Sequence, residues 1–84
     1  MKLVLVKWVD SHAGRGWQTP DRLEQIAEPL FCQSVGWLVK ENREVKIIAP
    51  HIAGERHGDA MLQYSGDMTI PVKSIVSVTI IRDV

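Results

Sequence analysis

The stretch that most constrains the fold runs from Ser34 to Pro50 and reads SVGWLVKENREVKIIAP. Apolar residues alternate with other residues in both of its halves, and this period of two marks β-strands. The polar segment 40–44 separates the halves, and Asn42 within it tolerates the left-handed backbone conformation that tight turns use. The stretch therefore predicts a β-hairpin, with strands over 35–39 and 45–49, on which the rest of the chain is arranged.

Segments at both ends of the chain predict further strands. Segment 2–9 carries apolar residues on both faces, which is typical of a strand that is covered on both sides. Segment 75–81 has one face made only of Val76, Val78 and Ile80. Because that face is uniformly apolar, we expect it to point at the core.

A short helix is predicted between the first strand and the hairpin. Thr19 is a typical N-cap residue, and Pro20 suits the first helical position. The pattern predicts a helix over 20–27. Two helical turns are too few to be stable alone, so Leu23, Ile26 and Leu30 are expected to dock against the sheet.

The remaining segments are short strands and connections. The Gly-containing polar segments 10–19 and 50–59 are predicted loops. Short strands are predicted over 60–64 and 68–70, and a single tight turn over 71–74 leads into the last strand.

The predicted fold class is mainly β, in a single domain over residues 1–84. Five or six short strands, with one short helix at about 20–27 inserted after the first strand, favour a small and strongly bent barrel. A chain of this size builds a thin core, so association into a homo-oligomer is a reasonable way to bury more apolar surface.

Composition restricts the compartment and the partners. Ten basic and ten acidic residues give a formal net charge of zero, which does not favour nucleic-acid binding because that binding rests on an excess of positive charge. Cys32 is the single cysteine, so no intrachain disulfide forms, and this fits a reducing compartment. No stretch is long enough to span a bilayer, so a cytoplasmic protein without a membrane partner is expected.

The back half of the chain resembles SH3-like and Sm-like small barrels. The resemblance rests on the hairpin segments 35–39 and 45–48 and on the ending MTIPVKSIVSV over 68–78. In those folds a strand, a single tight turn and a final strand close the barrel. The resemblance implies an architecture and carries no functional residues.

Most of the chain is also similar to a group of short uncharacterised proteins encoded by bacteriophages and prophages. The residues that carry this likeness are VKWVDS at 6–11, GW at 16–17, VGWLV at 35–39, IAPHI at 48–52 and MTIP at 68–71. The likeness implies a phage or prophage origin and expression in a bacterial cytoplasm.

Candidate residues for binding a protein partner are Arg15, Trp17 and Trp37. Trp17 lies in a Gly-rich loop, where it either folds back as a lid over the core or serves as an exposed anchor for a partner. Trp37 lies in a strand, where a core position is the simpler interpretation and a groove position is the alternative.

A nucleic-acid site is the alternative to a protein-binding site. Lys40, Arg43 and Lys46 form the local basic cluster, at the predicted hairpin tip, and Glu41 and Glu44 interleave with them. Small barrels often bind nucleic acid through basic and aromatic surfaces. The simpler interpretation is a solvated turn whose charge pairs contribute little.

Catalytic and metal chemistry find little support in the sequence. The run Asp10-Ser11-His12 contains the residue types of a hydrolase triad, but consecutive residues of a strand point in alternating directions. His51, His57 and Asp59 are weaker candidates for metal ligands, without a recognised spacing. The sequence therefore predicts a non-enzymatic interaction module without a cofactor; a small enzyme that depends on a metal or on Cys32 and a histidine is the second alternative.

Overall fold

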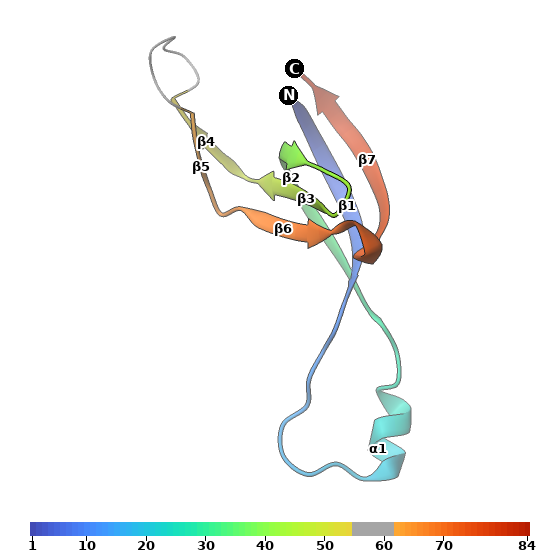
Figure 1. The fold of residues 1–84 in the computed structure, drawn as a ribbon. Helices are drawn as coiled ribbons and strands as arrows, with labels where there is room; N and C mark the ends of the chain where they lie inside the picture. The colour runs from blue at the N-terminus through green and yellow to red at the C-terminus, as the bar shows by residue number, and fades with distance from the viewer. Residues whose placement is uncertain (55–61) are drawn as a thin grey trace.

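The computed structural model describes residues 1–54 and 62–84 of the chain (Figure 1). The described part is mainly β, as predicted. Its elements in chain order are β1 (Lys2–Asp10), α1 (Pro20–Gln25), β2 (Leu30–Glu41), β3 (Val45–Ala49), β4 (His51–Ala53), β5 (Gln63–Ser65), β6 (Met68–Pro71), the 3-10 turn η1 (Val72–Ser74) and β7 (Ile75–Asp83).

Five strands form one antiparallel sheet in the order β6-β3-β2-β1-β7, and β4 pairs with β5 in a separate two-stranded sheet. The predicted barrel is not closed. The strands β6 and β7 are the two edges of the large sheet, and in the described part of the chain they are joined through η1 but do not pair with each other.

The small sheet continues the hairpin of β3 and β6 beyond a bend. Pro50 interrupts the first strand between β3 and β4, and Gly66 interrupts the second between β5 and β6 with φ at 75°. A Cβ atom on Gly66 would lie 3.0 Å from Cγ of Pro50, so the two chains approach closely at the bend. The prediction of a loop over 50–59 was therefore wrong at its start, where His51–Ala53 is a strand.

The core is small and lies on one face of the large sheet. Its fully buried residues come from three strands that are distant in sequence, and Trp8, Leu38 and Ile75 pack against them. The indole Nε1 of Trp8 donates a hydrogen bond to Oγ of Ser34 at 3.0 Å, which satisfies the polar end of this ring. The buried hydrophobic residues are Val4, Val6, Ile48, Ala49 and Ile70.

The apolar face of β7, made of Val76, Val78 and Ile80, lies next to this core but stays exposed. Val78 pairs with Val6 and Ile80 pairs with Val4, and paired residues in a sheet share a face. The side chains of Val76, Val78 and Ile80 nevertheless remain 61%, 37% and 52% exposed. Val78 and Ile80 therefore lie on the core side of the sheet, as predicted, but the face is not buried, because no described strand covers this edge of the open sheet.

The helix is shorter than predicted and does not dock on the sheet. It ends at Gln25, and Ile26 has left helical geometry with φ of −103° and ψ of 9°. Oγ1 of Thr19 accepts the N–H of Arg22 at 3.3 Å, so the predicted N-cap is present. Leu23 is half exposed, and Figure 1 shows α1 at the far end of a long extension from the sheet.

The turn at the tip of the β2–β3 hairpin is stabilised by the side chain of Asn42, whereas a left-handed backbone conformation was expected there. In the described part of the chain, positive φ angles occur only at glycines. Oδ1 of Asn42 instead accepts the backbone N–H groups of Glu44 and Val45 at 2.8 and 2.9 Å. The asparagine therefore shapes the turn by replacing a backbone acceptor.

The molecule is elongated, with extents of 59 × 24 × 21 Å. The radius of gyration is 17.1 Å, whereas a compact chain of this length has about 12 Å. No described helix has the length and apolar character needed to cross a membrane.

Candidate functional site

Residues 11–29, called the arm below, extend from the sheet where β1 and β2 continue beyond their neighbours. These two strands stay paired as far as Asp10 and Leu30, whereas β7 leaves β1 at Trp8. A two-stranded ribbon therefore carries the arm away from the core, as Figure 1 shows.

Local hydrogen bonds give the arm its shape. Nε2 of Gln18 donates to the carbonyl oxygen of Arg15 at 2.9 Å. Across the arm, Nε2 of His12 lies 2.7 Å from the carbonyl oxygen of Glu28. Gly16 adopts φ of 73°, a conformation that other residues rarely take. These contacts lie within the arm itself and do not involve the sheet.

Trp17 lies in this loop with its side chain fully exposed. The indole does not cover the core, so the interpretation of Trp17 as a lid was wrong. Arg15, two residues earlier, is also exposed. The structure thus leaves both residues accessible to a partner, which is the condition that the alternative interpretation requires.

Further apolar side chains are uncovered on the arm and at its base. Leu23 and Leu30 are about half exposed, and Phe31, the second residue of β2, is 71% exposed. Burial of such side chains is favourable by roughly 25 cal/mol per Å² of apolar area. A shallow groove under the helix is lined by His12, Gln25, Ile26, Glu28, Pro29 and Leu30.

Trp37 lies far from the arm, toward the other end of β2. It pairs with Leu3 of β1 and with Ala49 of β3, and its side chain is half-buried. The strand from Leu30 to Trp37 rises about 3.3 Å per residue, so Trp37 does not share a surface with Trp17. The small cavity at Trp37 is lined by Met1, Ile52, Leu62 and Val84.

The basic residues of the hairpin tip are mixed with acidic ones. Nζ of Lys46 lies 3.4 Å from Oε1 of Glu41. Lys40 and Arg43 are exposed, and Arg43 lines a small cavity with Glu44. Because the carboxylates lie among the cations, the tip offers a phosphate less attraction than an uninterrupted basic patch would.

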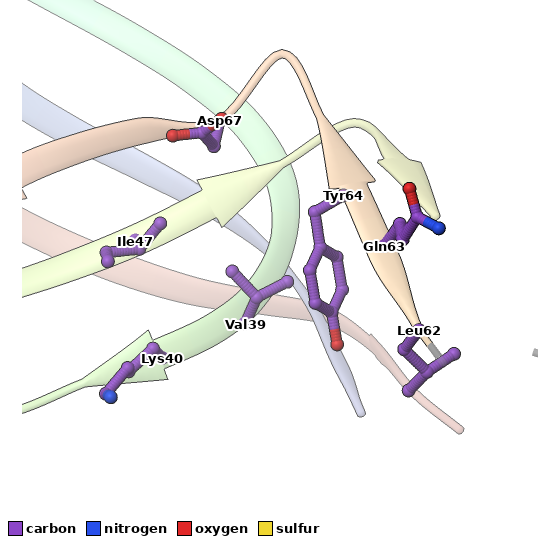
Figure 2. Close-up of a pocket in the computed structure, with 7 residues that line it drawn as sticks. All are labelled: Val39, Lys40, Ile47, Leu62, Gln63, Tyr64 and Asp67. Atoms are coloured by element: carbon purple, nitrogen blue, oxygen red, sulfur yellow. The ribbon is translucent and has the colours of Figure 1, made fainter. Parts of the chain in front are cut away.

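A groove beside β2, β3 and β5 was not singled out by the sequence pattern (Figure 2). It has a volume of about 530 Å³, and Figure 2 shows the ring of Tyr64 beside Val39. Tyr64 reaches this place only because the chain bends at Gly66. The one sequence signal for this groove was the aromatic residue Tyr64 in the otherwise polar strand β5. The lining residues are Val39, Lys40, Ile47, Leu62, Gln63, Tyr64 and Asp67.

The candidate metal ligands are placed only in part. His51 lies exposed on β4, whereas His57 and Asp59 lie outside the described residues. Within residues 1–54 and 62–84, no three His, Cys, Asp or Glu side chains gather in a way that suits a metal ion.

The catalytic candidates are not arranged as a triad. The backbone N–H of Ser11 donates to Oδ1 of Asp10 at 2.8 Å, while the ring of His12 turns to Glu28 across the arm. The base is therefore directed away from the nucleophile that it would have to activate. Cys32 is half-buried at the base of the arm.

The chain matches no protein-family model, no curated protein and no solved structure. The function is therefore inferred from the fold and from the surfaces described above.

Proposed function

We propose that the chain is a non-enzymatic interaction module that binds a host or phage protein through the arm. The observation that carries the proposal is the fully exposed indole of Trp17, held on an extension away from the core. Tryptophan and arginine are the residues that most often dominate binding energy at protein interfaces, and Arg15 lies beside this tryptophan in the sequence.

The expected partner has an apolar cleft that takes the indole, with a carboxylate near it for the guanidinium of Arg15. An Arg–carboxylate pair of this kind gives orientation as well as energy. The exposed Leu23 and Leu30 would add apolar contact around this centre. The half-buried Trp37 belongs to a separate surface and is not part of this proposed interface.

The proposal includes a phage origin, a bacterial cytoplasm as the location, and an SH3-like or Sm-like ancestry of the sheet. The single Cys32 supports a reducing compartment. The sheet order and the turn η1 between the edge strands β6 and β7 support the small-barrel relationship. The likeness to phage proteins supports the origin.

The test compares capture from bacterial lysate by the wild-type chain and by the double variant Arg15→Ala, Trp17→Ala. The matched control is Arg43→Ala, Tyr64→Ala, which removes the same kinds of side chain from the sheet. We expect the arm variant to lose the specific partner and the control to retain it. With that partner purified, Trp17→Ala alone should weaken binding by roughly 30-fold, the effect of a hot-spot residue.

The opposite pattern would overturn the arm as the binding site. If the Arg43 and Tyr64 variant loses the partner and nuclease treatment also removes it, the hairpin tip binds nucleic acid. Equal capture by all three proteins, or no specific capture by any of them, would also contradict the proposal.

A further inference from the structure

The edge strand β7 is long, apolar and unpaired on one side. Its nine residues pair with β1, and in the described part of the chain no strand lies against the other side. Charged residues appear only at its end, with Arg82 and Asp83. Proteins usually protect such an edge with charge, proline, a bulge or a cover, because it is a template for pairing with another chain. The ladder between β1 and β7 is irregular next to Leu3 and next to Trp8, and it is regular over residues 77–80 of β7.

The direction of the backbone groups of β7 follows from its contact with β1. The N–H of Val84 donates to the carbonyl oxygen of Met1 at 3.0 Å, so the odd-numbered residues of β1 direct their backbone groups toward β7. Leu5 and Lys7 pair with Thr79 and Ser77. The backbone N–H and C=O groups of Thr79 and Ser77 therefore point toward β1. The backbone groups of Val78, which lies between them, point away from β1 toward the open edge of the sheet.

We infer that β7 pairs with β7 of a second copy of this chain, in antiparallel orientation about a two-fold axis at Val78. This surface is distinct from the arm and does not depend on the arm's function. The pairing joins the two five-stranded sheets into one continuous sheet. An isologous contact of this kind closes on itself and yields a dimer rather than a fibre.

The register about Val78 is self-complementary. Val78 lies opposite Val78 of the second copy, and Val76 lies opposite Ile80, so the exposed apolar rows meet. A register shifted by one residue, about Thr79, would instead place Val76 against Arg82.

The chain as a whole exposes more surface than a compact monomer, and the apolar residues of β7 are part of that surface. The chain exposes 6904 Å², about 1,900 Å² more than the roughly 5,000 Å² of a compact monomer of this mass. A standard interface takes about 800 Å² from each partner. A formal net charge of zero also leaves no strong repulsion between two copies.

The other edge is a poorer candidate for pairing with a second copy. The strand β6 has four residues and ends at Pro71, which lacks a backbone N–H to donate. Dimerisation through β7 would direct the two arms to opposite ends of the joined sheet, because the second copy runs antiparallel. The dimer would then offer a partner two separated arms.

The first test is sedimentation velocity on the full chain from about 1 to about 100 μM. We expect the wild type to form a dimer within this range. Val76→Lys places a charge on the β7 edge at its most exposed apolar position and should weaken dimerisation by about tenfold or more. Thr69→Lys is the matched control, because it places the same charge on the β6 edge, and Trp17→Ala should also dimerise normally.

A crosslinking experiment keeps the inference testable if Val76→Lys fails to fold. In a Cys32→Ser background, Val78→Cys should form a disulfide-linked dimer on mild oxidation, because a hydrogen-bonded antiparallel pair holds its Cα atoms about 5.5 Å apart. Thr69→Cys in the same background should remain monomeric. A monomer at all concentrations, crosslinking through Thr69→Cys, or assemblies larger than a dimer would each overturn the inference.

Discussion

At the scale of single residues, Gly36 explains how β2 and β3 come together. A glycine inside a strand often marks a bulge, a bend or the close approach of another backbone. The structure shows close approach, since a Cβ atom there would lie 3.1 Å from the backbone nitrogen of Ala49 and 3.1 Å from Cβ of Ile48. A side chain at this position would push β3 away from the core.

Gly36→Ala should therefore lower the free energy of unfolding by about 1–3 kcal/mol, the usual effect of overpacking a tight site. Urea titration followed by tryptophan fluorescence would measure it. Gly14→Ala is the control, because its nearest contact is the flexible side chain of Gln18 at 3.6 Å. Equal midpoints for wild type and Gly36→Ala would contradict the close approach of the two strands.

At the scale of elements, α1 shows that a helix can be capped without being packed. None of its residues is buried, and Thr19 and the turns of the arm hold it locally. Its stability is therefore expected to be separate from that of the sheet, as is usual for regions with few buried contacts.

Thr19→Ala should destabilise α1 and leave the sheet folded. Loss of an N-cap destabilises a helix by about 0.5–2 kcal/mol, and α1 has no core contact to compensate. Hydrogen exchange should quicken at residues 20–26 and stay unchanged in β1 and β3. Thr19→Ser keeps the capping hydroxyl and should behave as the wild type. Faster exchange throughout the sheet would show that α1 supports the core after all.

At the scale of the whole molecule, the small core lies in the sheets and the long arm lies outside it. Within residues 1–54 and 62–84, the buried residues lie in β1, β2, β3 and β6, and the arm contributes none of them. The paired ends of the arm, Asp10 and Leu30, are held by the strand ladder. We therefore expect the sheet to fold without the arm.

Replacing residues 12–28 by a short Gly-rich turn should leave the sheet folded. Because a shorter loop is entropically easier to close, the thermal midpoint is expected to stay equal or rise slightly. Circular dichroism would show the strand signal and the cooperative transition. Partner capture by this variant should be lost. A variant without a cooperative transition would show that the arm is needed for folding.

The sequence predicted what local chemistry controls. A run that is apolar on both faces predicted β1, alternation of apolar residues predicted β3 and β7, and the Thr19–Pro20 pair predicted the start of α1. Arg15 and Trp17 were candidates because they lie in a Gly-rich loop, but the sequence left open whether Trp17 is exposed. The sequence could not find Tyr64 in its groove, because that position follows from a bend made jointly by Pro50 and Gly66. Two segments distant along the chain must meet before that groove exists.

By itself, then, the sequence determined a small β protein with one short capped helix, since hydrogen-bonding periods and turn residues act over a few neighbours. Only the tertiary structure decided which apolar residues are covered. The row Val76, Val78 and Ile80 reads as core, yet it lies exposed because the sheet stays open beyond β7. Trp17 could have folded over the core, and the paired ribbon of β1 and β2 holds it away instead. Burial depends on which strands meet, and that is a property of the assembled sheet.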